Sequence, residues 1–424
     1  KSIGDDVDAV TLCLNAPIRI VTGDGAFATS DRIGRMEDGT RWAGTGQIFG
    51  DAQQAVYMAM SALFLQPSNV WMFDGYKNEP GFDQYDVGAA AELLTNAQIA
   101  NTAIDAPHAS AEDWRRIASR PLDAGLIHVN TSGMRWHFDL NQGRAYAMDV
   151  PALRVPAIVH FVHSFSAQRV SDRNSIARRW LDRGAYAYVG AVDEPYLQAF
   201  LPPRTFIGRL ASPGALGLAA RHDEGRLWKV AIIGDPLLTL GPLMPRPAGE
   251  TGLEGADDLE SRMKSALEER KYFDALRDLI MLGRDADATR LAQSILEDDA
   301  QAWNVALSRL VVATLHRTGQ RDLFVRVFRT LPPEETQDPA LRDLAWLALR
   351  PELESGSPSR DVIDTLRAHV RSMCISEDGA ALAGAIRRLD GADAAASFLG
   401  NLMQMTDNKW HLDRMQRELT RISR

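Results

Sequence analysis

The 424-residue sequence has little of what marks several common classes of protein. Its two cysteines, Cys13 and Cys374, are too few for a disulfide framework or a cysteine-rich zinc site. Its longest apolar run, residues 55–65, is broken by Ser61 and is shorter than the roughly 20 residues that cross a bilayer. The 56 acidic residues outnumber the 47 basic ones, and this net charge of −9 argues against a dedicated nucleic-acid binder. We therefore expect no nucleic-acid partner and no membrane span.

Phosphate-binding and metal-binding motifs are also missing. The glycines at 44–50 are not followed by the Gly-Lys-Ser/Thr of a phosphate loop. The histidines, among them His108, His160 and His222, lack a ligand spacing such as His-x-x-x-His. We expect no cofactor and no metal.

The overall composition is that of a folded globular protein. Apolar residues make up 45% and charged residues 24%, whereas disordered chains combine few apolar residues with a high net charge. At roughly 150 residues per domain, this length predicts two or three domains. Residues 245–257 are rich in proline, glycine and acidic side chains, as linkers are. We expect an α/β domain over 1–244, a linker over 245–257 and a helical domain over 258–424.

The first domain alternates short β-rich runs with helical segments. Strands that alternate with helices predict a mostly parallel sheet flanked by helices. The glycines between residues 34 and 50 indicate a loop-rich stretch. We expect strands at 18–21, 70–73, 101–104, 125–129, 157–162, 185–189 and 229–233, and helices at 53–65, 86–100, from the N-cap Ser110 onward, and at 174–183.

The second domain is expected to be almost entirely helical. Leu259, Met263 and Leu267 open an apolar face with helical spacing. Residues 272–292 predict paired helices with small residues at their crossings, and breaks follow at 331–333 and 355–358. The pattern is typical of an α-solenoid-like helical repeat, a fold that offers concave surfaces to protein partners.

The carboxyl ends of the predicted strands carry the residues that could do chemistry, because sites in such sheets form at this edge. Ser164 and Ser166 follow the fourth main strand, where a nucleophile at a strand tip is a common catalytic geometry. His163 points to the other face of its strand, whereas His128 and Asn130 share a face of the preceding strand. The alternative is that the two serines hydrogen-bond the backbone at a strand exit.

Acidic side chains also follow these strands. Converging carboxylates bind a metal ion or a basic substrate group. The alternative is that each carboxylate caps a neighbouring helix and needs no ligand. The residues concerned are Asp74, Asp105, Asp193, Glu194 and Asp235.

Four segments, in this order, resemble the gingipain-type cysteine peptidases, a family with the caspase-like fold. Segments 31–36 and 46–51 are similar to the part of that family that precedes its first core helix, and 184–195 is similar to its Gly-Ala…Glu-Pro segment. The most specific match is Gly234-Asp235-Pro236, which follows Trp228 as in the closing strand of the family. The resemblance spans residues 18–241, a little over half of the chain, and implies a caspase-like domain ahead of the helical tail.

The resemblance breaks at both catalytic positions. In that family a histidine ends the third strand and a cysteine ends the fourth, and the cysteine thiolate attacks the peptide carbonyl. Matching the family's tryptophan to Trp136 places Asn130 on the histidine, and Ser164 falls on the cysteine. The resemblance therefore implies an inactive bacterial homologue, secreted or periplasmic, that binds a peptide or protein through the strand-end cleft and the helical tail.

A second hypothesis stays open from the residues alone. The chain would be a divergent hydrolase that uses Ser164 as nucleophile with His128 or His163 as base. A serine needs such a base within hydrogen-bonding reach, at about 3 Å in an open cleft. The position of the imidazole nitrogens relative to the Ser164 hydroxyl therefore discriminates between the two hypotheses.

Overall fold

A computed structural model describes residues 11–14, 17–23, 25–62, 65, 69–76, 81–212, 214–225, 229–240 and 255–423. The chain divides into two compact units, one of residues 1–118 and 122–248 and the other of 119–121 and 249–424. Most of the predicted linker, residues 245–254, lies outside the described residues, as does Trp228.

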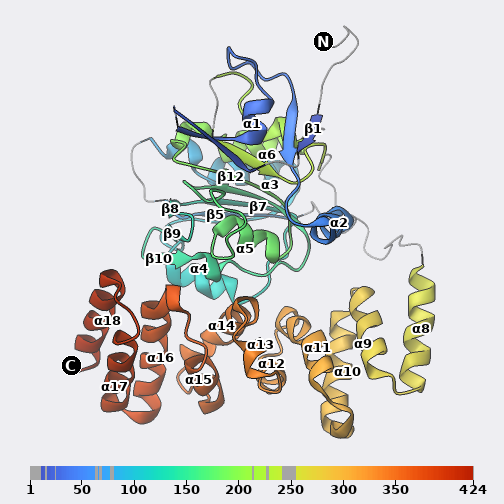
Figure 1. Cartoon of the computed structure of the whole chain (residues 1–424), viewed down its shortest axis with the longest axis vertical. Helices are drawn as coiled ribbons and strands as arrows, with labels where there is room; N and C mark the ends of the chain where they lie inside the picture. Colours follow the sequence, from blue (N-terminus) through green and yellow to red (C-terminus); the bar gives the residue numbers. More distant parts are fainter. Residues whose placement is uncertain are drawn as a thin grey trace. The chain divides into compact units, whose positions relative to one another are not determined.

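The first unit is built on an eight-stranded sheet, as the alternation of strands and helices predicts (Figure 1). The order of the strands across the sheet is β1-β4-β13-β12-β11-β7-β5-β6. Most of the interior strands are largely apolar because both of their faces are covered, and β4 is the exception. The strands are β1 (Thr11–Leu14), β4 (Gly44–Gln47), β5 (Asn69–Asp74), β6 (Ala100–Ile104), β7 (Leu126–Asn130), β11 (Ala157–Val162), β12 (Ala185–Ala191) and β13 (Val230–Ile233).

The sheet is mixed, and the change of direction falls between β12 and β13. Strands β6, β5, β7, β11 and β12 run parallel to one another. Strand β13 pairs antiparallel with β12, with Ala191 opposite Val230. Strands β4 and β1 then run parallel to β13. The carboxyl ends of the first five strands therefore meet at one edge of the sheet, and that of β13 lies at the other edge.

Two helical layers cover this sheet (Figure 1). On one face, α3 and α6 pack on alternate strand residues such as Met72, Ile158 and Ile232. On the other face, α4 and α5 bury Trp114 and Trp180 against aromatic side chains of β5 and β11. The helices of this unit are α1 (Thr29–Ile33), α2 (Ala52–Ser61), α3 (Gly88–Asn96), α4 (Ala111–Ala118), α5 (Ile176–Asp182), α6 (Pro203–Ala211) and α7 (Leu216–Ala219).

Local sequence signals explain where these helices begin. The Ser110 hydroxyl accepts a hydrogen bond from the Asp113 amide (3.1 Å), and the Asp113 carboxylate accepts one from the Ser110 amide (3.2 Å). This reciprocal pair confirms the predicted cap of α4. Asp51 and Ser175 cap α2 and α5 by accepting from the amides of Gln54 and Arg178. Helix α3 is shorter than predicted, because Gln98 takes the left-handed conformation (φ 59°) and ends it.

The prediction of a loop over residues 44–47 is wrong, because this segment is strand β4. The glycines of β4 allow close packing, but in the sequence they are typical of a loop. A Cβ on Gly46 would lie 2.6 Å from the carbonyl oxygen of Gly234 at the exit of β13. The strand predicted at 18–21 is confirmed as β2 (Arg19–Thr22), which pairs antiparallel with β3 (Gly25–Ala28). The sequence gives no prediction for β3 or for the three short antiparallel strands β8 (Ser132–Met134), β9 (His137–Asp139) and β10 (Arg144–Tyr146).

The second unit is helical throughout its described residues, as predicted. Its buried side chains form one continuous apolar core from Met263 to Ile422, and each helix packs mainly on its neighbours in the chain. None of its helices, nor any other in the described ranges, is long and apolar enough to cross a bilayer. The helices are α8 (Ala256–Glu268), α9 (Tyr272–Met281), α10 (Asp285–Asp298), α11 (Val305–Arg317), α12 (Arg321–Phe328), α13 (Pro333–Thr336), α14 (Pro339–Leu353), α15 (Arg360–Arg367), α16 (Ile375–Asp390), α17 (Ala392–Met403) and α18 (Lys409–Ile422).

The turns of this unit repeat one helix-ending motif. Gly283 and Gly319 take the left-handed conformation, with φ of 70° and 73°. The following amide then donates to the carbonyl five residues back, as in Arg284 to Leu279 (2.9 Å). This motif satisfies the free carbonyls at the end of α9 and of α11 and reverses the chain within a few residues.

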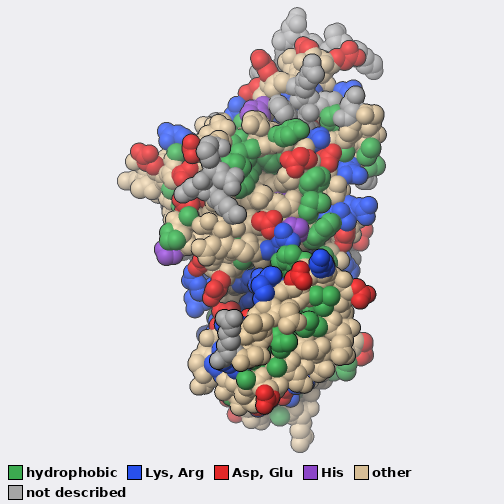
Figure 2. Space-filling view, turned by 90° about the vertical axis from the view of Figure 1, so that its left-hand side faces the viewer, with side chains coloured by type: hydrophobic (Ala, Val, Ile, Leu, Met, Phe, Trp, Pro, Cys, Tyr) green, Lys and Arg blue, Asp and Glu red, His purple; other side chains and the backbone are tan. Residues whose placement is uncertain are grey.

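Acidic and basic side chains are interspersed over the face that Figure 2 shows. This mixture agrees with the nearly balanced counts of 47 basic and 56 acidic residues.

Candidate functional site

Most of the predicted site residues lie at the edge where β5, β6, β7, β11 and β12 end. Asp74 and Asn130 are directly opposite each other on paired strands. The segment after β11 lies beside the end of β12, where the Phe165 amide donates to the Asp193 carbonyl (3.3 Å). Asp235 is not part of this edge, because it follows the antiparallel β13, and its carboxylate accepts a hydrogen bond from the Leu237 amide (2.8 Å) of its own turn.

His128 is the centre of a buried hydrogen-bonded chain under α6. Its Nε2 lies 2.8 Å from the amide oxygen of Asn130, and its Nδ1 lies 3.0 Å from Nδ1 of His160. The amide nitrogen of Asn130 donates to the carbonyl of Tyr85 (2.5 Å). All three polar side chains are 0% exposed, and the His160 ring packs on Phe206 at 4.1 Å between centroids.

These hydrogen bonds define which ring nitrogens of His128 and His160 donate and which accept. Since the Asn130 amide nitrogen is the donor to Tyr85, its oxygen faces His128 and accepts from Nε2–H. Nδ1 of His128 is then an acceptor, so His160 donates from its own Nδ1. His128, which donates from one ring nitrogen and accepts at the other, is therefore neutral. Burial lowers the pKa of His128 to about 4 and lowers that of His160 well below its usual value.

His163 is equally enclosed on the other face of the sheet. Its Nδ1 accepts from the Thr131 hydroxyl (2.9 Å), and its Nε2–H donates to the Met134 carbonyl (3.0 Å) in β8. The residue is 1% exposed, and burial lowers its pKa to about 4. The hydroxyl–imidazole–carbonyl arrangement has the order of a catalytic triad, but Thr131 is also only 1% exposed. The arrangement is closed to substrate.

Neither candidate base reaches the candidate nucleophile. Both ring nitrogens of His128 and both of His163 are used in the bonds above, and none of the four is bonded to Ser164. Ser164 is half-buried. Ser166 is 0% exposed, and its carbonyl accepts from the Ala177 amide (3.2 Å) in α5. The serines therefore lie at the strand exit without the base that hydrolysis requires.

Asp74 is the acidic residue most altered by its surroundings. It is 8% exposed, and its carboxylate accepts a hydrogen bond from the Tyr76 amide (3.1 Å). Burial raises its pKa to about 7, and the negative charges of Asp105 and Asp86 act in the same direction. Burial next to Asp74 raises the pKa of the Tyr76 phenol well above its usual value. This corner of the edge is acidic and contains the phenol of Tyr76.

The remaining acidic residues differ in how far they are already engaged. Asp105 binds the amide of Ala106 (2.5 Å), and Glu194 binds the amide of Tyr196 (3.3 Å). Asp193 is neutralised by Lys229 at 3.3 Å. Glu194 is exposed, and its charge reaches Tyr76. Among the residues with described positions, no group of three or more His, Cys, Asp or Glu is arranged to hold a metal ion.

Sequence reasoning missed Thr131, Tyr76 and the role of His160. The signal for His160 was present, because its position opposite His128 follows from aligning the two strands in parallel. The Met134 carbonyl that His163 binds lies in the β8–β9 hairpin. The two strands of this hairpin have three residues each and were too short to be predicted from the sequence. Cys374 is buried in the second unit, and the side chain of Cys13 is outside the described residues.

Comparisons with known proteins do not identify a family for this sequence. No protein-family model matches the sequence, and no curated protein matches it. A solved structure described as "Structure of Protease" is similar, with a TM-score of 0.34 and 8% identity. The match covers 47% of this chain and 56% of that protein, so the chain spans little more than half its length. A likeness of this extent carries no information about what this chain does.

Proposed function

We propose that this chain is a non-catalytic homologue of gingipain-type peptidases that binds a peptide or protein partner. One observation carries the proposal: every ring nitrogen of His128 and His163 is hydrogen-bonded inside the protein, and none to Ser164. General base catalysis needs an imidazole that can take a proton near neutral pH, whereas burial holds both pKa values at about 4. Asn130, at the position that matches the family's histidine, has no basic nitrogen.

The acidic side chains at this edge of the sheet favour a partner that carries lysine or arginine. Burial raises the pKa of Asp74 and the charge of the half-buried Asp105 raises it further, while the exposed Glu194 acts on the neighbouring Tyr76. A lysine or arginine side chain from an extended peptide would relieve this repulsion. The helical unit supports a binding role in a different way, because stacked helices present a long continuous surface to a partner.

Activity probes test the non-catalytic half of the proposal. The full chain would be treated with a serine-reactive fluorophosphonate and a mixed peptide library, beside the variants Ser164→Ala and His128→Ala. We expect no labelling and no cleavage in the wild type, with the fold intact by circular dichroism. Labelling that disappears in both variants would establish the hydrolase hypothesis instead and would identify its two catalytic residues.

Fluorescence polarisation tests the binding half. Labelled peptides rich in arginine or lysine would be compared with glutamate-rich ones on the wild type, Glu194→Gln and Glu92→Gln. Glu92 is an exposed acid on α3 and gives the same change of charge. We expect the basic peptide to bind, Glu194→Gln to weaken it by about two- to fivefold, as for one exposed ion pair, and Glu92→Gln to leave it unchanged. Equal loss in both variants, or no binding of the basic peptide, would contradict the proposal.

A further inference from the structure

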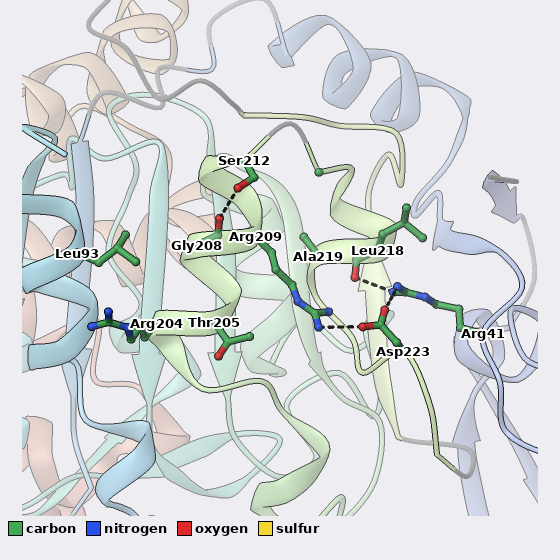
Figure 3. Close-up of a pocket in the computed structure, with 11 residues that line it drawn as sticks. Arg41, Leu93, Arg204, Thr205, Gly208, Arg209, Ser212, Leu218, Ala219 and Asp223 are labelled. Atoms are coloured by element: carbon green, nitrogen blue, oxygen red, sulfur yellow. Dashed lines mark hydrogen bonds and ion pairs between the residues drawn. The ribbon is translucent and has the colours of Figure 1, made fainter. Parts of the chain in front are cut away.

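A pocket on the first unit lies away from the strand-end residues and contains an arginine pair (Figure 3). It has a volume of about 560 Å³, which is in the range of small-molecule sites. Its walls come from α3, α6, α7 and the loops on either side of them. Leu93, Leu218 and Ala219 give it apolar surface, and Thr205 and Ser212 give it hydroxyl groups.

Arg41 and Arg209 point toward one carboxylate from opposite sides (Figure 3). The Arg209 guanidinium lies 2.9 Å from one oxygen of Asp223, and Arg41 is bonded to the other oxygen. The side chain of Asp223 is 58% exposed, whereas that of Arg41 is 12% exposed. Arg41 is therefore part of the wall, Arg209 is partly exposed at 33%, and the carboxylate between them lies at the surface.

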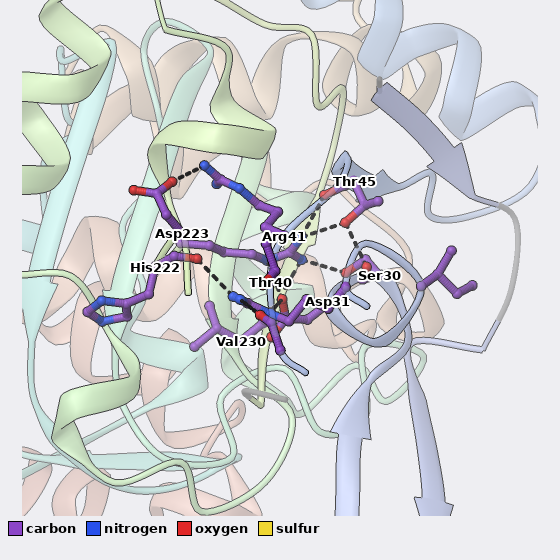
Figure 4. A network of polar contacts seen from close by, with 12 residues as sticks. Ser30, Asp31, Thr40, Arg41, Thr45, His222, Asp223 and Val230 are labelled. Atoms are coloured by element: carbon purple, nitrogen blue, oxygen red, sulfur yellow. Dashed lines mark hydrogen bonds and ion pairs between the residues drawn. The ribbon is translucent and has the colours of Figure 1, made fainter. Parts of the chain in front are cut away.

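The fold holds these cations in position through a buried polar network (Figure 4). Arg35 donates to the carbonyl of His222 (2.9 Å), and the Arg41 amide donates to the carbonyl of Asp223 (3.0 Å). Arg209 donates to the carbonyl of Arg221 (2.9 Å), whose own guanidinium binds the Thr45 hydroxyl (2.6 Å) and other groups of the core. Both arginine forks are thus oriented before any ligand arrives, which reduces the entropy that binding costs.

Positive charge is in excess at this place. Among the described residues, four guanidiniums, those of Arg35, Arg41, Arg209 and Arg221, pair with the carboxylates of Asp31 and Asp223. Burial lowers the pKa of Arg41, the carboxylates of Asp223 and Asp31 raise it, and the charges of Arg209 and Arg35 lower it. Such a cluster is unexpected on a chain with a net charge of −9. A bound anion would compensate it.

We propose that this pocket binds an organic carboxylate, which displaces Asp223 and is held by the forks of Arg41 and Arg209. Asp223 already shows that one carboxylate fits between the two guanidiniums, with one oxygen on each. The apolar side chains beside it favour an organic anion over a bare inorganic one. The carboxylate comes either from a free small acid or from an acidic side chain of a peptide.

Calorimetric titration of the full chain tests this proposal. The probes are succinate, its neutral diamide, inorganic phosphate, and an acetylated, amidated glutamate peptide with its glutamine counterpart. We expect a carboxylate probe to bind and its amide counterpart not to bind. Asp223→Asn removes the internal competitor and should tighten binding by about three- to tenfold, since it frees two ion pairs. Arg209→Gln should weaken binding by about tenfold or more, the value of a charge-assisted hydrogen bond.

The matched control is Arg154→Gln, which removes a surface arginine paired with Asp123 at 3.7 Å. It should leave binding unchanged. Succinate binding would assign a free acid, and binding of the glutamate peptide alone would assign a peptide ligand. The proposal is overturned if Asp223→Asn does not bind more tightly than the wild type, if Arg209→Gln binds equally well, or if phosphate binds and the carboxylates do not.

Discussion

His163→Gln is the substitution that separates a buried structural histidine from a catalytic one. In the wild type, Nδ1 of His163 accepts from the Thr131 hydroxyl and Nε2–H donates to the Met134 carbonyl. A glutamine amide offers one acceptor and donors of its own, so it satisfies the same two partners without an ionisable ring. The variant therefore changes the titration of this site more than its packing.

The expected effect is a change in how stability depends on pH. Burial lowers the pKa of His163 from 6.5 to about 4 in the folded chain. Between these two pH values the unfolded chain binds a proton that the folded chain does not, so the free energy of unfolding falls as the pH falls. The contribution is fully present above pH 6.5 and lost as the pH drops to about 4. The lost part is worth about 3 kcal/mol, at about 1.4 kcal/mol per pKa unit.

Urea unfolding of the wild type and His163→Gln at several pH values measures this contribution. At pH 6.5 and above the two proteins should differ little. As the pH falls toward 4, the wild type should lose about 3 kcal/mol more than the variant. Nuclear magnetic resonance of the His163 ring should show a midpoint near 4. Parallel pH profiles, or a ring that titrates near 6.5, would refute the closed geometry and return His163 to the list of possible bases.

Two further predictions concern buried charge. Asp74→Asn should raise the free energy of unfolding above pH 7 by up to about 4 kcal/mol, because burial raises the pKa of the folded carboxyl from 3.8 to about 7. In urea unfolding this gain should vanish as the pH falls to about 4, where the wild-type carboxyl is protonated. An unchanged stability would contradict the raised pKa. Arg371→Met should destabilise the helical unit by about 3 kcal/mol, because it removes the guanidinium that lies 2.7 Å from the buried Asp378 and leaves that carboxylate with the more distant Arg350, at 4.0 Å. Arg360→Met, which breaks an exposed pair with Asp390, is the matched control and should cost much less in the same assay.

The sequence predicted the central parallel strands well because their signal is local. Strands β5, β7, β11 and β12 are continuous apolar runs that end in polar residues, and each lies within a residue or two of its predicted bounds. Strand β4 was not predicted, because its glycines allow close packing against the residue that follows another strand. A contact between segments distant in the sequence leaves no local pattern. The antiparallel direction of β13 was not predicted either, because an apolar run of four residues does not indicate the direction of a strand in a sheet.

The sequence predicted on which faces of their strands the candidate histidines lie, but it did not predict how they are bonded. Alternation along a strand correctly placed His128 and Asn130 on one face and His163 on the other. It could not show which atoms they bind, because the partners Tyr85, Met134 and His160 come from three separate segments. Asp235 was grouped with the other acids only through the assumption that its strand was parallel to theirs.

The hydrogen bonds of Asn130 explain why replacing it with histidine would not create a base at this edge. Its amide nitrogen holds the Tyr85 carbonyl and its oxygen holds His128, so both ends of the side chain are committed. A neutral histidine at position 130 would offer one donor and one acceptor to these two partners, so neither ring nitrogen would be free to take a proton. Protonating that ring would leave Nε2–H of His128 without its acceptor, and an unpaired buried group of this kind costs about 1–3 kcal/mol. The polar residues at this edge are thus arranged to satisfy one another, and a proton acceptor for catalysis would have to be built at the cost of that network.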